Sequence, residues 1–245
     1  MIEVRRRKRG LVYAQKWFAR TLSPGDALRL VAYHQFLGRR PGAPFLRHPF
    51  TTVLIDLRRE PEAIMADMHK NVRGEIRRAD GEGLRWEEGV DPAEFAAFHG
   101  AFAREKGIAG VDLAQLKSFK DALFLTRATQ NGTTLAQHAY IMDRAEGRAR
   151  FLYSSSGRFE GASSALVGRA NRWCHWRDIV SLREQGIQTY DLGGIAVGSA
   201  VTAEVSGINE FKLRFGGTIA REDHWLSPLY ALATFAGKLG RRVAG

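Results

Sequence analysis

The chain has 245 residues, of which 44% are apolar and 26% are charged, which is the composition of a globular protein with a sizeable core. No apolar run approaches the ~20 residues that would span a bilayer, and no apolar segment of the kind found in secretory signals follows the basic N-terminal cluster. A single cysteine, Cys174, excludes an intramolecular disulfide and a cysteine-based zinc site. The chain is therefore expected to be cytoplasmic.

The charge balance indicates an anionic partner. The formal net charge is +11 and the pI is near 10.2. Candidate partners are a CoA pyrophosphate, an RNA backbone, a nucleotide-linked cell-wall precursor or an acidic membrane surface, whereas DNA is not expected. The seven histidines show no metal-ligand spacing such as His-Glu-x-x-His, so no metal site is predicted.

Residues 1–50 are predicted to form an N-terminal extension that packs on a main domain over 51–245. Within the extension, 11–14 has the apolar character of a strand. The segment 24–36 is predicted to be a helix because Asp26 lies near its start and apolar residues recur on one face.

The main domain begins with a strand and then becomes helical. β-branched and apolar residues over 51–57 predict the strand. A single helix is predicted over 61–79, with apolar residues at helical spacing and a basic stripe of Lys70, Arg73 and Arg77 on its other face. Three further elements complete this half: a strand at 84–87, a helix capped by Asp91 and a helix at 113–123.

The pattern then changes to strands. Three runs at 123–129, 133–142 and 148–155 are separated by turns that contain glycine, and the first turn is an Asn-Gly pair, a strong hairpin signal. A long helix is predicted over 163–185, ended by Gly186. The remaining elements are a strand at 189–194, a strand near 218–225 and a helix at 229–243.

Two glycine pairs bracket the most informative stretch of the chain. The first pair ends the strand at 189–194, and the second ends the apolar and basic run 207–217. Glycine permits positive φ or a close approach of the backbone to a ligand. A central strand that parts from its neighbour here predicts a cleft, with 207–217 extended so that Lys212 and Arg214 point to the same side. Two tight turns around a core strand are the alternative.

The same stretch resembles a known family signature. YDLGGI at 190–195, a variable loop and GINEFKLRFGG at 207–217 are similar to the closing signature of the Fem-type peptidyltransferases and related GNAT-superfamily acyltransferases. The strand containing 55–57 and the Arg-rich helix at 71–79 extend the resemblance, which covers roughly 51–225, most of the chain. It implies an α/β fold with a GNAT-like mixed, largely antiparallel sheet flanked by helices, and the order of the predicted elements agrees with that fold.

The join before the long helix resembles a phosphate-binding loop. Arg158, Gly161, Ala162 and Ser163 differ at one position from the GNAT pattern Gln/Arg-x-x-Gly-x-Gly/Ala. The segment follows a strand and opens a helix, where free N–H groups and the helix dipole favour a phosphate. The resemblance implies that these four residues bind the CoA pyrophosphate, and an ordinary Ser-capped helix is the alternative.

The resemblance places Lys212 beside the reacting acyl group. Acyl transfer builds negative charge on the carbonyl oxygen, which a fixed cation stabilises. Asp191 would orient Lys212 or accept a proton from the attacking amine, and Tyr153 would be the general acid for a leaving thiol. The alternatives are a solvated lysine on a strand edge, a carboxylate that accepts backbone N–H bonds and a structural tyrosine.

Four residues are assigned to the substrate. Arg73 and Arg77 would hold the phosphates of a nucleotide-linked acceptor or of tRNA through bidentate contacts, with a solvated basic face as the alternative. Phe211 and Asn209 belong to the closing signature and would line the substrate side, with Phe211 in the core as the alternative.

The leading hypothesis is an acyltransferase that moves an acyl group from acyl-CoA to an amine or hydroxyl of a small-molecule or cell-envelope precursor acceptor, without a metal. The first alternative is a Fem-like aminoacyl (peptidyl) transferase that uses aminoacyl-tRNA. Its full architecture would include a second GNAT-like half and often a coiled-coil arm, whereas only residues 1–50 are unassigned. The second alternative is a non-catalytic binding module on a GNAT scaffold.

The last predicted helix suggests one more partner. It ends in Arg241-Arg242, which would permit peripheral contact with an anionic membrane. Packing of this helix against the body of the protein is the preferred interpretation.

Overall fold

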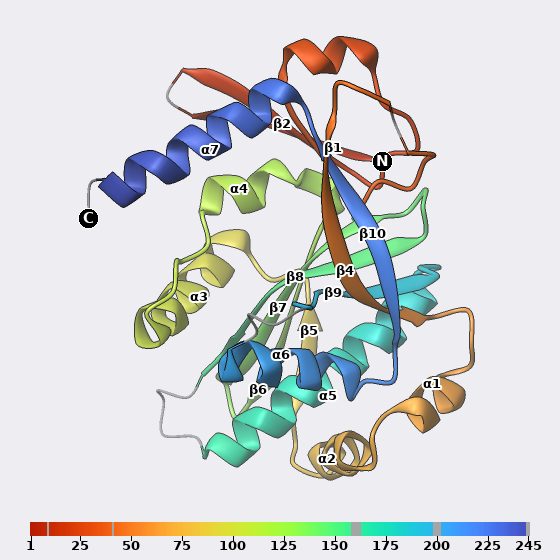
Figure 1. Cartoon of the computed structure of the whole chain (residues 1–245). Coiled ribbons are helices and arrows are strands. Elements are labelled where there is room, and N and C mark those ends of the chain that lie inside the picture. The colour runs from red at the N-terminus through yellow and green to blue at the C-terminus, as the bar shows by residue number, and fades with distance from the viewer. Residues whose placement is uncertain (9, 41, 158–162, 198–201, 244–245) are drawn as a thin grey trace. The chain divides into compact units, whose positions relative to one another are not determined.

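The structure is a computed structural model that describes residues 1–8, 10–40, 42–157, 163–197 and 202–243. It has an α/β fold of mostly antiparallel strands flanked by helices (Figure 1), which confirms the predicted fold class. The chain forms two compact units. The larger unit is Thr52–Ile219, and the smaller one joins Met1–Thr51 with Ala220–Gly245.

The larger unit contains strands in the order β4-β9-β8-β7-β6-β5. Neighbouring strands are antiparallel except for β8 and β9, which run parallel. In the described part of the chain, β8 and β9 pair only from Arg148–Arg150 to Thr189–Asp191, although both strands continue beyond these residues. The strand bounds are β4 Leu46–Asp56, which begins in the smaller unit, β5 Arg85–Glu88, β6 Leu123–Gln130, β7 Thr133–Asp143, β8 Arg148–Ser156 and β9 Thr189–Gly194.

Helices cover both faces of this sheet. They are α1 Pro61–Asp67, α2 Lys70–Asp80, α3 Pro92–Lys106, α4 Leu113–Ser118, α5 Ser164–Glu184 and α6 Ala203–Leu213, with the short 3-10 helix η2 Lys120–Ala122. On β6, Phe124 belongs to the hydrophobic cluster that includes residues of α2 and α5, whereas Leu125 belongs to the cluster with α3 and α4. Because successive side chains of a strand point to opposite faces, these two pairs of helices lie on opposite faces of the sheet.

The smaller unit has its own strands and core. Strand β1 pairs antiparallel with β2, β2 pairs parallel with β3, and β3 pairs antiparallel with β10. Val31, Tyr33 and Trp225 are among the buried residues that form its core. The element bounds are β1 Ile2–Lys8, β2 Leu11–Trp17, η1 Pro24–Leu28, β3 Leu30–His34, β10 Thr218–Leu226, which begins in the larger unit, and α7 Pro228–Val243.

The predicted helix at 24–36 is wrong. The structure has the short η1 followed by the strand β3. Val31 and Tyr33 are buried, and the backbone of β3 is paired on one side with β2 and on the other with β10. Strand pairing on both sides therefore decides the conformation, although the apolar spacing of this segment also suits a helix.

The predicted helix at 61–79 is two helices. Met68 has an extended backbone with φ −67° and ψ 147°, which ends α1. The ring Nδ1 of His69 then accepts a hydrogen bond from the Asn71 backbone N–H at 3.3 Å and caps α2. The apolar spacing continues across the break because Met68 and Val72 are both buried in the same core cluster.

The expected extended segment at 207–217 is also wrong, since most of it is helix α6. Thr202 caps this helix by accepting a hydrogen bond from the Val205 N–H at 3.3 Å. Phe211 and Phe215, four residues apart, pack together with ring centroids 5.2 Å apart and join the core cluster. Residues four apart point to the same side in a strand as well, but a strand would place them about 13 Å apart, too far for this ring contact.

Candidate active site

Helix α6 presents two polar side chains to the end of β9. The Lys212 Nζ donates a hydrogen bond to the Gly194 carbonyl oxygen at 2.6 Å. The Asn209 Nδ2 donates to the Ala196 carbonyl oxygen at 2.7 Å, and its Oδ1 accepts from the Ala196 N–H at 3.1 Å. Residues three apart lie on the same side of a helix, so this side of α6 is fastened to the chain that leaves β9.

Glycines make the close approach of these segments possible. Gly193 has φ +79°, and a Cβ there would lie 3.1 Å from the Phe151 carbonyl oxygen and 3.6 Å from the Lys212 Nζ. A side chain at this position would therefore be strained, tight against the Phe151 carbonyl oxygen and in contact with the lysine. In the second pair, Gly216 has φ +78° and a Cβ there would collide with the Asp67 backbone.

Asp191 lies buried on β9 and accepts hydrogen bonds on both carboxylate oxygens. Its Oδ1 accepts from the Thr52 hydroxyl and from the Gly193 N–H, and its Oδ2 accepts from the Arg148 Nη2 at 2.6 Å. Burial alone would raise the pKa of Asp191, but the positive charges of Arg148 and Arg150 outweigh it and hold that pKa below its ordinary value. Asp191 is therefore an anion at neutral pH.

Arg148 and Arg150 are site residues that the sequence analysis did not identify. They alternate along β8, and Arg150 is the backbone partner of Asp191 across the parallel pair. The Arg150 Nη2 lies 3.7 Å from the Cβ position of Gly193, so its charge is close to that of Lys212. The signal was present in the sequence, because Arg-x-Arg on a predicted strand places two cations on one face.

The environment lowers the proton affinity of Lys212. Partial burial, reinforced by repulsion from Arg150 and opposed by Asp191, lowers the pKa of Lys212 from 10.5 to about 8. At neutral pH most of the amine is still protonated. The group therefore combines an N–H donor with a positive charge in a half-buried setting, close to the charges of Arg150 and Asp191.

We expect the pH dependence of stability to reveal this shift. The unfolded chain binds more protons than the folded one between the folded pKa of about 8 and the unfolded value near 10.5, so Lys212 makes stability rise with pH in this window. The wild type should therefore gain stability relative to Lys212→Met between these pH values in urea unfolding. A relative loss over the same window would show that folding raises the pKa of Lys212.

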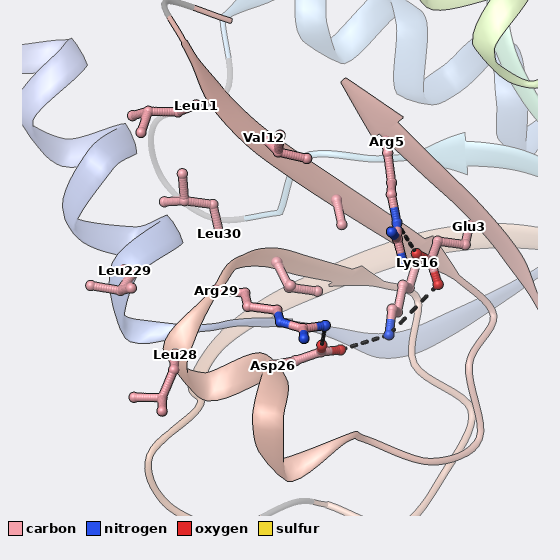
Figure 2. A pocket seen from close by; sticks show the side chains of 12 residues that line it. Glu3, Arg5, Leu11, Val12, Lys16, Asp26, Leu28, Arg29, Leu30 and Leu229 are labelled. Atoms are coloured by element: carbon pink, nitrogen blue, oxygen red, sulfur yellow. Dashed lines mark hydrogen bonds and ion pairs between the residues drawn. The ribbon is translucent and has the colours of Figure 1, made fainter. Parts of the chain in front are cut away.

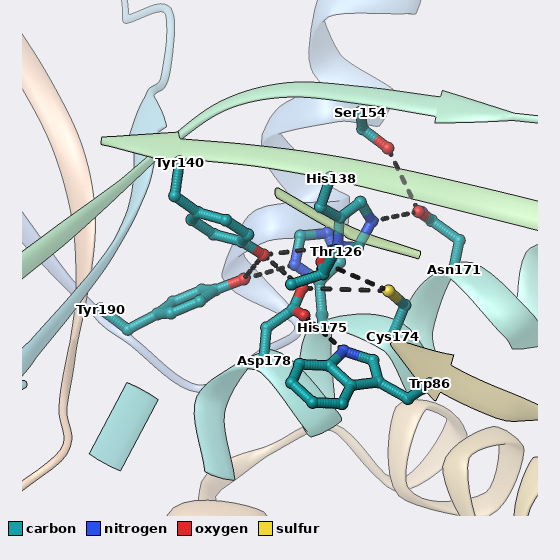
Figure 3. Close-up of polar contacts among 10 residues, drawn as sticks. All are labelled: Trp86, Thr126, His138, Tyr140, Ser154, Asn171, Cys174, His175, Asp178 and Tyr190. Carbon is teal, nitrogen blue, oxygen red and sulfur yellow. Dashed lines mark hydrogen bonds and ion pairs between the residues drawn. The ribbon is translucent and has the colours of Figure 1, made fainter. Parts of the chain in front are cut away.

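A buried polar network lies among α5, β7 and β9 (Figure 3). The Tyr190 hydroxyl is 2.5 Å from His175 Nδ1 and 2.8 Å from the Tyr140 hydroxyl, which donates to Asp178 Oδ2 at 2.5 Å. Burial raises the pKa of both tyrosines well above the ordinary value and lowers the pKa of His175 well below it. Tyr190 immediately precedes Asp191 on β9, so the network holds this strand directly beside the buried carboxylate of the site.

Three members of this network are of the types that bind metals. Ligand atoms of His138, His175 and Asp178 lie within 4.8 Å of one another and are all buried. In the present arrangement His138 Nδ1 lies 2.6 Å from Asp178 Oδ2, and the Trp86 Nε1 donates to Asp178 Oδ1 at 2.8 Å. These carboxylate oxygens are thus engaged within the protein. Cys174, the neighbour of His175, is buried, and burial raises its pKa well above the ordinary value, so it is not a thiolate nucleophile.

The other predicted site residues lie in different surroundings. Tyr153 packs in the cluster with α3 and α4, with its ring 5.5 Å from that of His99. The Arg73 Nη1 donates to the carbonyl oxygens of Ala66 and Met68, so this side chain joins α2 to the end of α1. Arg77 is exposed on α2. Phe211 packs against the core and lies 5.5 Å from the Arg172 guanidinium carbon.

The predicted phosphate loop falls mostly outside the described residues. Arg158, Gly161 and Ala162 are not among them, and Ser163 is. Ser163 caps α5, because its Oγ accepts a hydrogen bond from the Leu166 N–H at 3.2 Å.

No helix in the described part of the chain combines the length and the apolar character that crossing a membrane requires.

No family model matches this sequence, and no curated protein matches it. Solved structures do match in fold. FemX matches with a TM-score of 0.66 at 12% identity, covering 94% of this chain and 85% of FemX. The C-terminal domain of a putative lysylphosphatidylglycerol synthetase from Agrobacterium fabrum matches with a TM-score of 0.59 at 13% identity, covering 88% of this chain and 74% of that one.

A third match is L-PGS from Bacillus licheniformis, with a TM-score of 0.55 at 12% identity, covering 82% of this chain and 69% of that one. At these identities the likeness concerns the fold. The mixed sheet of the larger unit, with β8 and β9 as a parallel pair among antiparallel neighbours, and the likeness to FemX confirm the resemblance found in the sequence: this chain has a Fem-like GNAT fold.

Proposed function

We propose that this protein is an acyltransferase that moves an acyl group from an activated donor to an amine or hydroxyl of a small-molecule or cell-envelope precursor acceptor. The observation that carries the proposal is the placement of Lys212. Its ammonium is half-buried, held at the glycine end of β9 and backed by Arg150. A fixed cation with an N–H donor in such a place suits the oxyanion of an acyl transfer.

In the proposed reaction, the lone pair of the acceptor forms a bond to the acyl carbon, and the carbonyl oxygen takes up negative charge. Lys212 exchanges its hydrogen bond to the Gly194 carbonyl oxygen for one to this oxyanion. When the oxyanion collapses, the bond from the acyl carbon to the donor breaks, and the proton lost by the acceptor balances the charge of the leaving group. Positioning of donor and acceptor together with this stabilisation is sufficient, so no covalent enzyme intermediate is needed.

We assign Asp191 an orienting role in this reaction. Its pKa is depressed, and its oxygens accept hydrogen bonds from Thr52, Gly193 and Arg148. A carboxylate in this state is a weak base for the proton of an attacking amine. Its charge instead holds Arg148, and it also favours the protonated form of Lys212.

Acyl-CoA is the donor that we propose first. The support is the resemblance of Arg158, Gly161, Ala162 and Ser163 to a pyrophosphate loop, together with the position of Ser163 at the start of α5. The first N–H groups of a helix of this length bind phosphate well. The acyl carbon would then be carried by a thioester, which releases a thiolate.

Aminoacyl-tRNA is the second candidate donor, and the length of the fold match favours it. This chain covers 85% of FemX, so the shortness of residues 1–50 no longer argues against a Fem-like transferase. The chemistry at Lys212 would be the same, with an ester oxygen in place of the sulfur as leaving atom. A direct comparison decides between them: the protein is incubated with labelled acyl-CoAs and with charged tRNAs, and acylated amine is measured.

A thermal-shift measurement tests the CoA proposal. A ligand at a hundredfold excess over its Kd adds about 2.7 kcal/mol to stability, which corresponds to a rise of roughly 5–10 °C in the Tm of a chain of this size. We expect CoA to produce such a rise and Gly161→Val to abolish it with little change in the Tm of the free protein. If millimolar CoA leaves the wild-type Tm unchanged, aminoacyl-tRNA becomes the preferred donor.

A further inference from the structure

The net positive charge of this protein belongs to one of its compact units. The unit formed by Met1–Thr51 and Ala220–Gly245 carries 15 Lys and Arg against 4 Asp and Glu, a net charge of +11. The unit Thr52–Ile219 carries 22 of each and is formally neutral. The smaller unit therefore accounts for the whole net charge, whereas the candidate active site lies in the larger one.

Large apolar side chains are exposed on the same unit. Along α7, Leu229, Leu232 and Phe235 occur at three-residue spacing and are 44%, 66% and 68% exposed. Leu28, at the end of η1, is 81% exposed. Side chains three residues apart on a helix lie in a row, so α7 carries an apolar stripe that is exposed to solvent.

The start of α7 is firmly anchored, which fixes the direction of this stripe within the unit. The buried hydroxyl of Ser227 accepts hydrogen bonds from the N–H groups of Val31 and Tyr230 and donates to the Arg29 carbonyl oxygen. The ring of Tyr230 packs edge-on against that of Tyr13 at 5.9 Å. The exposed stripe therefore lies on a helix whose first turn is fixed to the rest of its unit.

A groove of about 500 Å³ lies beside the first turn of α7 (Figure 2). Leu11, Leu28, Leu30 and Leu229 line its side next to the helix, and Glu3, Arg5 and Lys16 stand on the other side. Asp26 forms ion pairs with Lys16 at 2.6 Å and with Arg29 at 3.8 Å. The side chains of Arg5 and Arg29 are both 69% exposed. Apolar and cationic groups thus share one groove.

An apolar and a basic side chain also pair across the strands that form the groove. Arg7 is directly opposite Val12 across the β1–β2 pair, so the two side chains share a face. Arg7 is exposed, and Val12 is 52% exposed. An exposed arginine and an exposed valine accordingly lie side by side on this face.

We propose that this face, made of Arg5, Arg7, Leu28, Leu229, Leu232 and Phe235, docks peripherally on an anionic lipid bilayer. Arginines attract the negative surface, and the apolar side chains of α7 enter the boundary between headgroups and acyl chains. A second copy of the chain fits less well, because it would bring a second unit of charge +11 against the first. RNA would engage the arginines and leave Leu28 and Leu232 without a role. The proposal does not depend on the proposed transferase activity.

Vesicle co-sedimentation of the full chain tests this docking. Vesicles of phosphatidylcholine alone are compared with vesicles of equal parts phosphatidylcholine and phosphatidylglycerol, and we expect binding only to the second. Leu232→Gln with Phe235→Gln should weaken this binding about tenfold or more without changing the Tm, because both side chains are exposed. Arg5→Gln with Arg7→Gln should weaken binding and reduce its sensitivity to salt. Ile108→Gln with Ile219→Gln, which alters two other exposed apolar residues, is the matched control and should bind like the wild type.

Several outcomes would overturn the proposal. Equal sedimentation with the two kinds of vesicle would show that lipid charge is irrelevant. Full binding by the Leu232→Gln, Phe235→Gln variant would show that net charge alone causes the binding and that the apolar side chains of α7 do not enter the bilayer. If this variant instead loses a dimer seen by light scattering, or loses affinity for tRNA in parallel with vesicles, the face serves a second copy or RNA.

Discussion

Replacing Lys212 with methionine is expected to lower the turnover of acyl transfer by about a hundredfold or more, the usual effect of losing one oxyanion contact. The interaction strengthens only as charge develops on the carbonyl oxygen, so kcat should fall while the KM for the donor changes little. Steady-state kinetics with the donor identified by the incubation experiment measures both. The expectation is the same for a thioester and for an aminoacyl ester, because both pass through a tetrahedral oxyanion.

Arg214→Met is the matched control for loss of one positive charge. Arg214 was expected to share a strand face with Lys212, but the helix separates them. The Arg214 Nη2 donates to Glu210 Oε1 at 2.6 Å at the surface, whereas Lys212 reaches back to Gly194. Full activity of Lys212→Met, or a mere weakening of donor binding like that of Arg214→Met, would mean that the lysine has no part in the chemistry.

Asp191→Asn is expected to lower the free energy of unfolding by about 3–5 kcal/mol, because it removes one member of a buried ion pair and leaves the other charged. Arg148 is itself buried, so its guanidinium cannot recover hydration. Arg150 and Lys212 add positive charge nearby. Equilibrium urea unfolding at pH 7 measures the difference.

Asp56→Asn provides the contrast. Asp56 lies on β4 and pairs with Arg58 at 2.8 Å, but the Arg58 side chain is exposed and that of Asp56 partly exposed, so the loss should be about 1 kcal/mol or less. Because the pKa of Asp191 is depressed in the folded protein, its contribution to the free energy of unfolding depends on pH. The contribution is complete above the unfolded pKa and disappears as pH falls through the lower folded pKa. An Asp191→Asn loss as small as that of Asp56→Asn would show that the buried pair contributes little.

Several features of the fold are predictable from short stretches of sequence. The Asn131-Gly132 turn has φ +50° and φ +81° and joins β6 to β7 as a hairpin. Asp91 caps α3, accepting hydrogen bonds from the N–H groups of Ala93 and Glu94. Each of these structures is stabilised by atoms within a few residues, so the local sequence contains the whole signal.

The candidate site was predictable in part. The glycine pairs indicated where backbones approach closely, and the resemblance to the Fem-type signature singled out Lys212 and Asp191. The partner of Lys212 was not predictable, because Lys212 lies in helix α6 and not in the expected extended segment. Arg148 became part of the site only through its contact with Asp191, 43 residues further along the chain.

The sequence by itself determined the caps, the hairpin, the positive-φ glycines and the total charge of +11, because each depends on residues that are adjacent or simply counted. The tertiary structure alone decided that 24–36 contains a strand, since β3 is defined by its pairing with β2 and β10. It also decided that the charge gathers in one unit, because Ala220–Gly245 returns to join Met1–Thr51. Such pairings depend on which distant faces bury each other, and a local pattern does not record that choice.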